Sequence, residues 1–168
     1  MSLSLYDITV PVFIRAFANL SAILEKGRAF ADENKIPHSE LLEARLYPDM
    51  APLTGQIQRA SDSSKFVAVR VGQIDNVPMA DTEASFDELQ ARIAATVALL
   101  KSISANAMDG REEAPVVLKA GNTERTFTAR EYVLAFALPN FFFHITTAYD
   151  ILRHKGVPLG KLDYLGRN

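Results

Sequence analysis

The sequence predicts an all-α protein, a four-helix bundle with a small β-hairpin inserted before the last helix. Four long segments carry apolar residues at helical spacing, the period that places them on one side of an α-helix. One short segment, about 115–128, is instead rich in β-favouring residues around a Gly-Asn pair. No internal repeat or composition shift divides the chain, so we expect a single domain over residues 1–168.

The composition is typical of a soluble globular protein. Hydrophobic residues make up 48% and charged residues 23%, with 18 Lys and Arg against 20 Asp and Glu. Disorder and general polyanion binding therefore fit poorly. Because there is no cysteine, disulfides, thiolate nucleophiles and Cys-based metal sites are excluded.

The N-terminal segment does not have the pattern of a secretory signal. It has no early positive cluster, and Asp7 interrupts its apolar stretch. No window of about 18 uncharged apolar residues is present, which argues against a membrane-spanning helix. We expect a cytoplasmic protein with no membrane partner. Basic residues near the C-terminus lack regular spacing and interleaved aromatic residues, so no nucleic-acid partner is expected either.

The first predicted helix covers about residues 5–34. Six apolar residues recur there on one helical stripe: Tyr6, Val10, Phe13, Phe17, Leu20 and Leu24. Pro11 costs little in or near the first turn, whose N–H groups lack intrahelical partners. The second predicted helix covers about residues 49–73 and has the same spacing, with Asp49 expected as its cap.

The third predicted helix covers about residues 85–104. It opens with a capping-box pattern, in which Ser85 is followed three residues later by Glu88. The hairpin of about 115–128 comes next, and Gly121-Asn122 suits its turn.

The fourth predicted helix covers about residues 129–155. Thr128 and Glu131 form a second capping-box pattern at its start. Pro139 removes one backbone hydrogen bond inside this segment, so it should kink or restart the helix. Residues 156–168 follow as a tail.

His144 is the side chain in the last helix with the clearest chemical interest. A helical wheel places it within the apolar arc, so it should face the bundle interior, with Asn140 one turn earlier. Two interpretations stay open. His144 is either a core histidine hydrogen-bonded to an interior partner such as Tyr or Gln, or a ligand or general base in a pocket. His154 lies on the opposite half of the wheel and cannot share a metal ion with it.

Three motifs provide the strongest family signal. They are LYPDM at 46–50, NFFFHITTAY at 140–149 and GVPLGKLDYLG at 156–166. Together they resemble an uncharacterised domain-of-unknown-function family within the DinB-like helix-bundle superfamily, over essentially the whole chain. The resemblance implies a DinB-like four-helix bundle. Members of this superfamily include thiol transferases and metal-dependent hydrolases and are often dimeric, so a homodimer is expected.

The resemblance also implies a divalent metal, held by one histidine of the second helix and two histidines one turn apart in the last. This sequence departs from that pattern. His144 fits one ligand position, but Asn140 and Ala148 lie four residues before and after it, and Gln56 is the nearest polar candidate in the second helix. One imidazole with two amides is a poor donor set for Zn²⁺ or Ni²⁺. We therefore expect no tightly bound cofactor, with a weakly bound divalent metal as the less favoured case.

The favoured function is the binding of a small molecule in the bundle cavity around His144, which would serve as acid or base in any reaction. The tail is expected to fold over the opening. The candidate ligand-binding residues are Tyr47, Asp49, Gln56, Asn140, Tyr149, Lys161, Asp163 and Tyr164.

Two alternative functions remain. The first is a metal-dependent transferase or hydrolase with a degenerate metal site, which tight stoichiometric metal would support. The second is a non-catalytic dimeric interaction or stress module, which filled space and fully paired polar groups around His144 would support. Phe143 falls on the polar half of its helix, where cover by the hairpin or tail is favoured over an oligomer interface. Whether the protein is an enzyme stays open.

Overall fold

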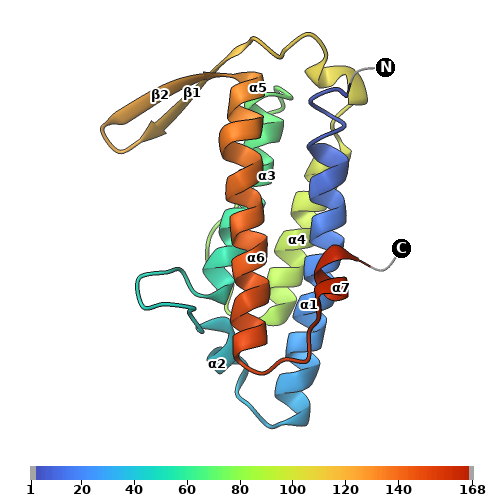
Figure 1. The fold of residues 1–168 in the computed structure, drawn as a ribbon, viewed down its shortest axis with the longest axis vertical. Helices are drawn as coiled ribbons and strands as arrows, with labels where there is room; N and C mark the ends of the chain where they lie inside the picture. Colours follow the sequence, from blue (N-terminus) through green and yellow to red (C-terminus); the bar gives the residue numbers. More distant parts are fainter. Residues whose placement is uncertain (1–2, 167–168) are drawn as a thin grey trace.

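In the computed structural model, which describes residues 3–166, four long helices pack as a bundle (Figure 1). They are α1 (Val10–Glu33), α3 (Leu53–Arg70), α4 (Phe86–Lys101) and α6 (Leu138–His154). Each lies inside its predicted range, so the all-α prediction is confirmed. Residues 167 and 168 of the predicted tail lie outside the described part of the chain.

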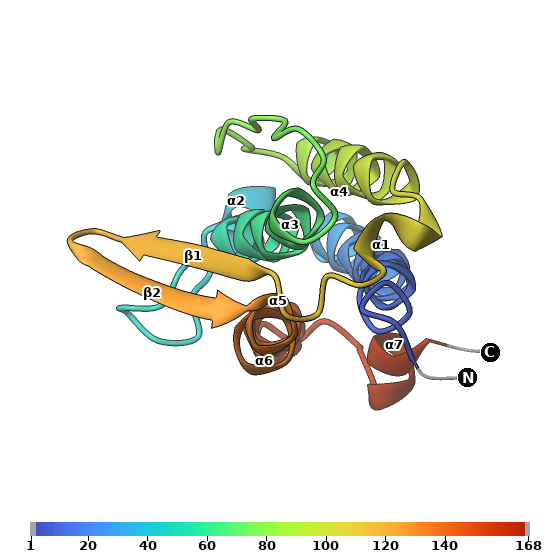
Figure 2. The ribbon, with the colours of Figure 1, turned by 90° about the horizontal axis from the view of Figure 1, so that it is seen from above.

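The helices follow one another in an order that places α1 and α3 on a diagonal of the bundle. Each of these two helices packs against α4 and α6 (Figure 2). Because α3 and α4 run in the same direction, residues 71–85 must return along the length of the bundle (Figure 1). In the described part of the chain, no helix is both long and apolar enough to cross a membrane.

Prolines set the starts of the first two long helices. Pro11 lies in the first turn of α1, which therefore begins at Val10 and not near residue 5. The prediction that Asp49 caps the second helix is wrong, since α3 begins at Leu53 with Pro52 in the cap position. A proline disfavours helical backbone in the residue before it, so the helix cannot extend back through Ala51 to Asp49.

Both predicted capping boxes are confirmed as helix starts. At α4 the hydroxyl of Ser85 accepts a hydrogen bond from the Glu88 N–H at 3.2 Å. At α5 (Ala129–Glu131) the Thr128 hydroxyl accepts from the Glu131 N–H at 3.2 Å, and the Glu131 carboxylate accepts from the Thr128 N–H at 2.9 Å. These bonds satisfy N–H groups that have no partner inside the helix.

The predicted interruption at Pro139 takes the form of a π-helical turn. This segment, η2 (Tyr132–Ala137), connects α5 to α6, and Pro139 lies in the first turn of α6. Pro139 has no N–H to donate to the preceding turn, and a wider turn accommodates the missing bond. The chain thus continues from η2 into α6 as one helical column. Because the π-helical turn is wider, the side chains before Pro139 are rotated about the helix axis relative to those of α6.

The predicted hairpin is confirmed as β1 (Pro115–Ala120) and β2 (Thr123–Thr128). The two strands are antiparallel, and Pro115 pairs with Thr128. Gly121 begins the turn with a φ of +58°, a backbone conformation that favours glycine. The hairpin projects away from the bundle (Figures 1 and 2), and Val116 at its base is buried in the core.

Aromatic side chains from the first and last long helices meet in the core. The ring centroid of Phe141 lies 4.6 Å from that of Phe13 and 5.3 Å from that of Phe17. All three side chains are fully buried. This contact joins the predicted apolar stripe of α1 to the apolar face of α6.

A buried arginine ties the segment between α3 and α4 to the bundle. Arg92 of α4 forms salt bridges with Asp62 of α3 and with Asp81 and Glu83 of the connecting segment. Burial alone would raise the pKa of Glu83, but hydrogen bonds from Arg92 and Gln58 outweigh it and the pKa is lowered. The segment between α3 and α4 is therefore anchored to the bundle near its end.

Three short helical segments complete the fold. They are α2 (His38–Leu42), the 3₁₀ turn η1 (Ala105–Met108) and α7 (Lys161–Leu165). α7 lies in the predicted tail and packs against α1 (Figure 2).

Candidate functional site

His144 faces the bundle interior, as its position on the helical wheel predicts, with 9% of its surface exposed. Its Nδ1 lies 2.8 Å from Oε1 of Gln56 on α3. The other end of the Gln56 amide, Nε2, donates a hydrogen bond to the backbone oxygen of Ala51 at 2.9 Å. Because the Gln56 oxygen can only accept, the hydrogen of the imidazole is on Nδ1 and Nε2 keeps a lone pair.

The charge of His144 is determined by its surroundings. Burial, together with the positive charge of Arg59, lowers the pKa of His144 to about 4. The imidazole is therefore neutral at pH 7, and its Nε2 has no hydrogen-bond partner among residues 3–166. A base with such a low pKa is weak at neutral pH, but it accepts hydrogen bonds readily.

His144 lines a cavity of about 440 Å³ between α3, the η2–α6 column and the hairpin. We call it the His144 cavity. Basic, polar and aromatic side chains surround it: Arg59, Asp62, Ser63, Phe66, Arg70, Leu118, Lys119, Tyr132, Phe136, Ala137, Asn140 and His144. A cavity of this size can take a small organic molecule.

Three polar contacts join α3 to the opposite column along this cavity. The α3 residues are spaced seven apart, so they lie on one side of the helix two turns from each other. The pairs are Gln56 with His144, Ser63 with Asn140 at 2.7 Å, and Arg70 with Tyr132 at 2.8 Å. The antiparallel packing of the two columns thus determines which side chains share the cavity.

The lining of the His144 cavity carries an excess of positive charge. The lining contains three cations, Arg59, Arg70 and Lys119, and one carboxylate, Asp62. That carboxylate contacts Lys65 at 2.9 Å and Arg92 at 3.4 Å, two cations that do not line the cavity. The cavity is therefore suited to a negatively charged molecule.

The residues around His144 do not fit the divalent metal that the resemblance implies. His144 is the single imidazole, its Nδ1 is hydrogen-bonded to Gln56, and Asn140 donates its amide hydrogen to Ser63. Within residues 3–166, no three His, Cys, Asp or Glu side chains group closely enough to hold a metal ion. Arg59 adds a positive charge next to the imidazole, which opposes a second cation.

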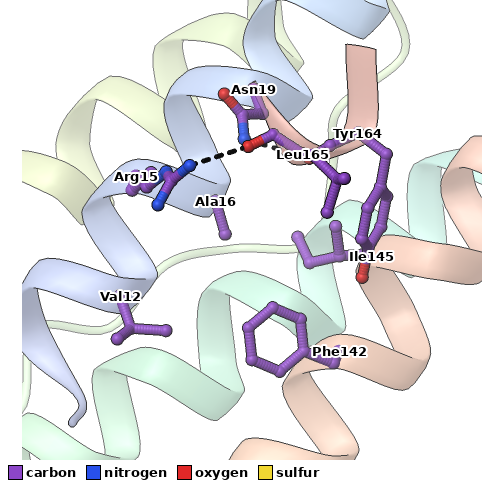
Figure 3. Close-up of a pocket in the computed structure, with 8 residues that line it drawn as sticks. All are labelled: Val12, Arg15, Ala16, Asn19, Phe142, Ile145, Tyr164 and Leu165. Carbon is purple, nitrogen blue, oxygen red and sulfur yellow. Dashed lines mark hydrogen bonds between the residues drawn. The ribbon is translucent and has the colours of Figure 1, made fainter. Parts of the chain in front are cut away.

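The C-terminal segment does not cover the His144 cavity, contrary to the expectation from its motif. Instead, α7 forms part of a second cavity of about 210 Å³ beside α1 and α6 (Figure 3). Asn19 donates to the backbone oxygen of Tyr164 at 3.0 Å, and Arg15 donates to that of Leu165 at 3.1 Å. These bonds hold α7 on α1, and mostly apolar side chains line the remaining space.

The other predicted ligand-binding residues lie away from His144. Tyr149, Lys161 and Tyr164 meet in a shallow cavity of about 220 Å³ between α6 and α7. Asp163 forms a salt bridge with Lys26 of α1 at 2.7 Å. Tyr47, with 66% of its surface exposed, and Asp49 are both exposed in the segment before α3. Of the predicted residues, the structure thus brings together Gln56, Asn140 and His144.

Several lining residues are absent from the candidates that the sequence predicts. On α3 they are Arg59, Ser63, Phe66 and Arg70, whose spacings of four, three and four form a second helical stripe. That stripe was available as a signal, although a stripe of mixed polarity is usually a solvated face. Tyr132 and Phe136 depend on the π-helical turn, which has no comparable sequence signal.

Comparisons with known proteins agree with this description. The model of a family described as a domain of unknown function (DUF1993) matches residues 5–165. The chain is also similar to a crystal structure of a DinB family member protein from Shewanella denitrificans, with 37% sequence identity and a TM-score of 0.88. That match covers 98% of this chain and 93% of the other. No curated protein matches the sequence.

Proposed function

Since the chain belongs to the DUF1993 family and has a DinB-like fold, we propose that it binds a small molecule in the His144 cavity without a tightly bound metal. The observation that carries this proposal is the state of His144. Its Nδ1 is hydrogen-bonded to Gln56, while its Nε2 accepts no hydrogen bond within residues 3–166 and the ring lines a cavity of about 440 Å³. Nε2 is not a buried atom, so a ligand in the cavity can reach it and donate a hydrogen bond to it.

The non-catalytic module is less well supported by the same observation. That alternative requires filled space around His144 and polar groups that are all paired within the protein. Space is open here, and Arg59 makes one long hydrogen bond within the described residues, from Nη1 to the backbone oxygen of Gly55 at 3.3 Å. Most donors of its guanidinium are therefore available to a ligand.

Fragment binding monitored at His144 tests the proposal. We expect members of a small-molecule library to shift the imidazole resonances of His144 in NMR spectra of the full chain. In Asn140→Trp, the larger side chain of a half-buried lining residue should fill the cavity and abolish the shifts. Leu134→Trp is the matched control, because Leu134 is exposed in the same helical column and does not line the cavity. A library that leaves His144 unshifted, or shifts that persist in Asn140→Trp, would contradict the proposal.

Metal content tests the alternative of a metal-dependent transferase or hydrolase. Elemental mass spectrometry of untagged protein, with His144→Ala as control, should show far less than one Zn²⁺, Ni²⁺ or Mn²⁺ per chain, because the donor set is poor. About one metal ion per chain in the wild type, lost in His144→Ala, would favour the metalloenzyme instead.

A further inference from the structure

We propose that the occupant of the His144 cavity is an organic anion whose acidic group binds Arg59 and whose apolar body lies against Phe66 and Phe136. This inference rests on the proposed small-molecule function and adds the chemical class of the ligand. Three features of the cavity carry it: the charges of its lining, the available donors of Arg59, and the apolar wall farther along α3.

The first feature is the distribution of charge. The cations of the lining are Arg59, Arg70 and Lys119, and the two other than Arg59 already have partners. Arg70 donates to the Tyr132 hydroxyl at 2.8 Å, and its guanidinium lies 4.4 Å from the Phe66 ring centroid. Lys119 lies 3.3 Å from Glu124 across the hairpin.

Arg59 differs from these two cations. It forms no salt bridge within residues 3–166, and its one hydrogen bond there is to the Gly55 backbone oxygen. Its planar guanidinium can bind a carboxylate or phosphate through two parallel N–H groups. Arg59 is thus the residue of the lining with the most unused capacity for an anion.

The neighbouring histidine restricts the ligand further. Because His144 is neutral and its Nε2 is an acceptor, a hydroxyl or N–H group of the ligand can donate to it while the acidic group binds Arg59. A dication at this place would be repelled by Arg59, whereas an anion is attracted. The polar end of the cavity therefore favours an acid that also carries a hydrogen-bond donor.

The length and aromatic lining of the cavity account for the apolar body of the proposed ligand. Arg59 and Arg70 are eleven residues apart on α3, roughly 16 Å along the helix axis. Phe66 lies between them on α3, and Phe136 of η2 lines the same cavity; both side chains are half-buried. An apolar body at these rings removes their surface from water, which inorganic phosphate cannot do.

Matched pairs of an acid and its neutral analogue test the inference in the full chain. The probes are benzoate with benzamide, 4-hydroxybenzoate with 4-hydroxybenzamide, phenyl phosphate with phenol, and inorganic phosphate alone. NMR titration at His144 should give dissociation constants about ten-fold lower for the organic acids than for their neutral partners. Arg59→Gln should remove that difference. Arg153→Gln, an exposed arginine of α6 outside the cavity, should preserve it.

The outcomes separate this inference from the proposed function. Equal binding of acids and amides at His144 would overturn the anion class and leave the small-molecule function standing. Inorganic phosphate that binds as tightly as the organic acids would overturn the role of the apolar wall. No shift with these probes, while neutral members of the wider library do shift His144, would also overturn the anion class. If no compound shifts the His144 resonances, the proposed function itself is contradicted.

Thermal unfolding checks that the Arg59→Gln variant is folded. Its melting temperature should match that of the wild type, because Arg59 is exposed.

Discussion

At the scale of single residues, one amide determines how the imidazole of His144 behaves. Gln56 is held by its bond to the Ala51 backbone, so its oxygen points to His144 and selects the Nδ1–H form. The same burial that makes this hydrogen bond strong also disfavours a charged ring. A residue that by its type suggests acid–base chemistry thus becomes a neutral hydrogen-bonding group.

This protonation state makes the stability of the fold depend on pH. The folded pKa of His144 is about 4, below its ordinary value of 6.5, so between these values the unfolded chain binds the proton more strongly. The neutral ring contributes its full amount to the free energy of unfolding above about pH 6.5, and this contribution is lost as the pH falls toward 4. We expect this loss to reach at most about 3 kcal/mol.

Urea unfolding of the wild type and His144→Gln between about pH 7.5 and 4.5 measures this effect. Glutamine stays neutral and can still bond Gln56, so the variant should lose less stability as the pH falls. Carboxyl groups such as Glu83 titrate in both proteins, and the difference between the two curves isolates His144. Parallel curves would show that His144 does not carry the shifted pKa.

At the scale of elements, the packing of α3 against the η2–α6 column creates the site. Pro139 removes a backbone donor, and the π-helical turn before it brings Tyr132 and Phe136 to the cavity. Wide turns of this kind occur often at functional sites in helices. The hairpin then adds Leu118 and Lys119 as a third wall.

One carboxylate adds to the contacts that hold the short helix α7 in place. Asp163 accepts a hydrogen bond from the Gly160 N–H at 2.8 Å and forms the salt bridge with Lys26. We expect Asp163→Ala to lower the local stability of α7 by about 1 kcal/mol, which raises amide hydrogen exchange at 161–165 about five-fold. Lys161→Ala, at an exposed position of the same helix, is the control. The global melting temperature should change little, and unchanged exchange in Asp163→Ala would disprove the role of this carboxylate.

At the scale of the whole molecule, the outer surface of the bundle includes one large aromatic residue beside the site. Phe143 has 54% of its surface exposed, so the favoured prediction that the hairpin or tail covers it is wrong. Its ring centroid lies 5.4 Å from that of His144. Aromatic residues are enriched at interfaces between chains, so Phe143 is the position at which to test for one.

The homodimer stays a prediction, and Phe143 offers a direct test. Light scattering with size-exclusion chromatography should give a dimer for the wild type, and Phe143→Ser should shift it toward the monomer because it removes apolar contact area. Leu134→Ser, another exposed apolar residue of the same column, is the comparison. A wild type that elutes as a monomer at about 100 μM would rule out a stable dimer.

The helices could be predicted from the sequence because their signals are local. The apolar stripe of α1, the caps at Ser85 and Thr128 and the turn at Gly121 each involve residues within a few positions of one another. The Asp49 pattern predicts the start of α3 too early, although the cause of the observed start at Leu53, namely Pro52, is equally local. The proline overrides the acidic cap pattern, because it disfavours helical backbone in the residue before it.

The sequence by itself determined the helical periodicity, the inward face of His144, the departure from the three-histidine metal pattern and the family to which the motifs belong. Only the tertiary structure decided that Gln56 is the partner of His144, that Arg59 lies beside it, and that α7 binds α1 and leaves the His144 cavity uncovered. The physical reason is the distance along the chain between the residues that interact. Periodicity and capping follow from the geometry of a single helix, whereas a cavity depends on the register between helices that are far apart in the chain.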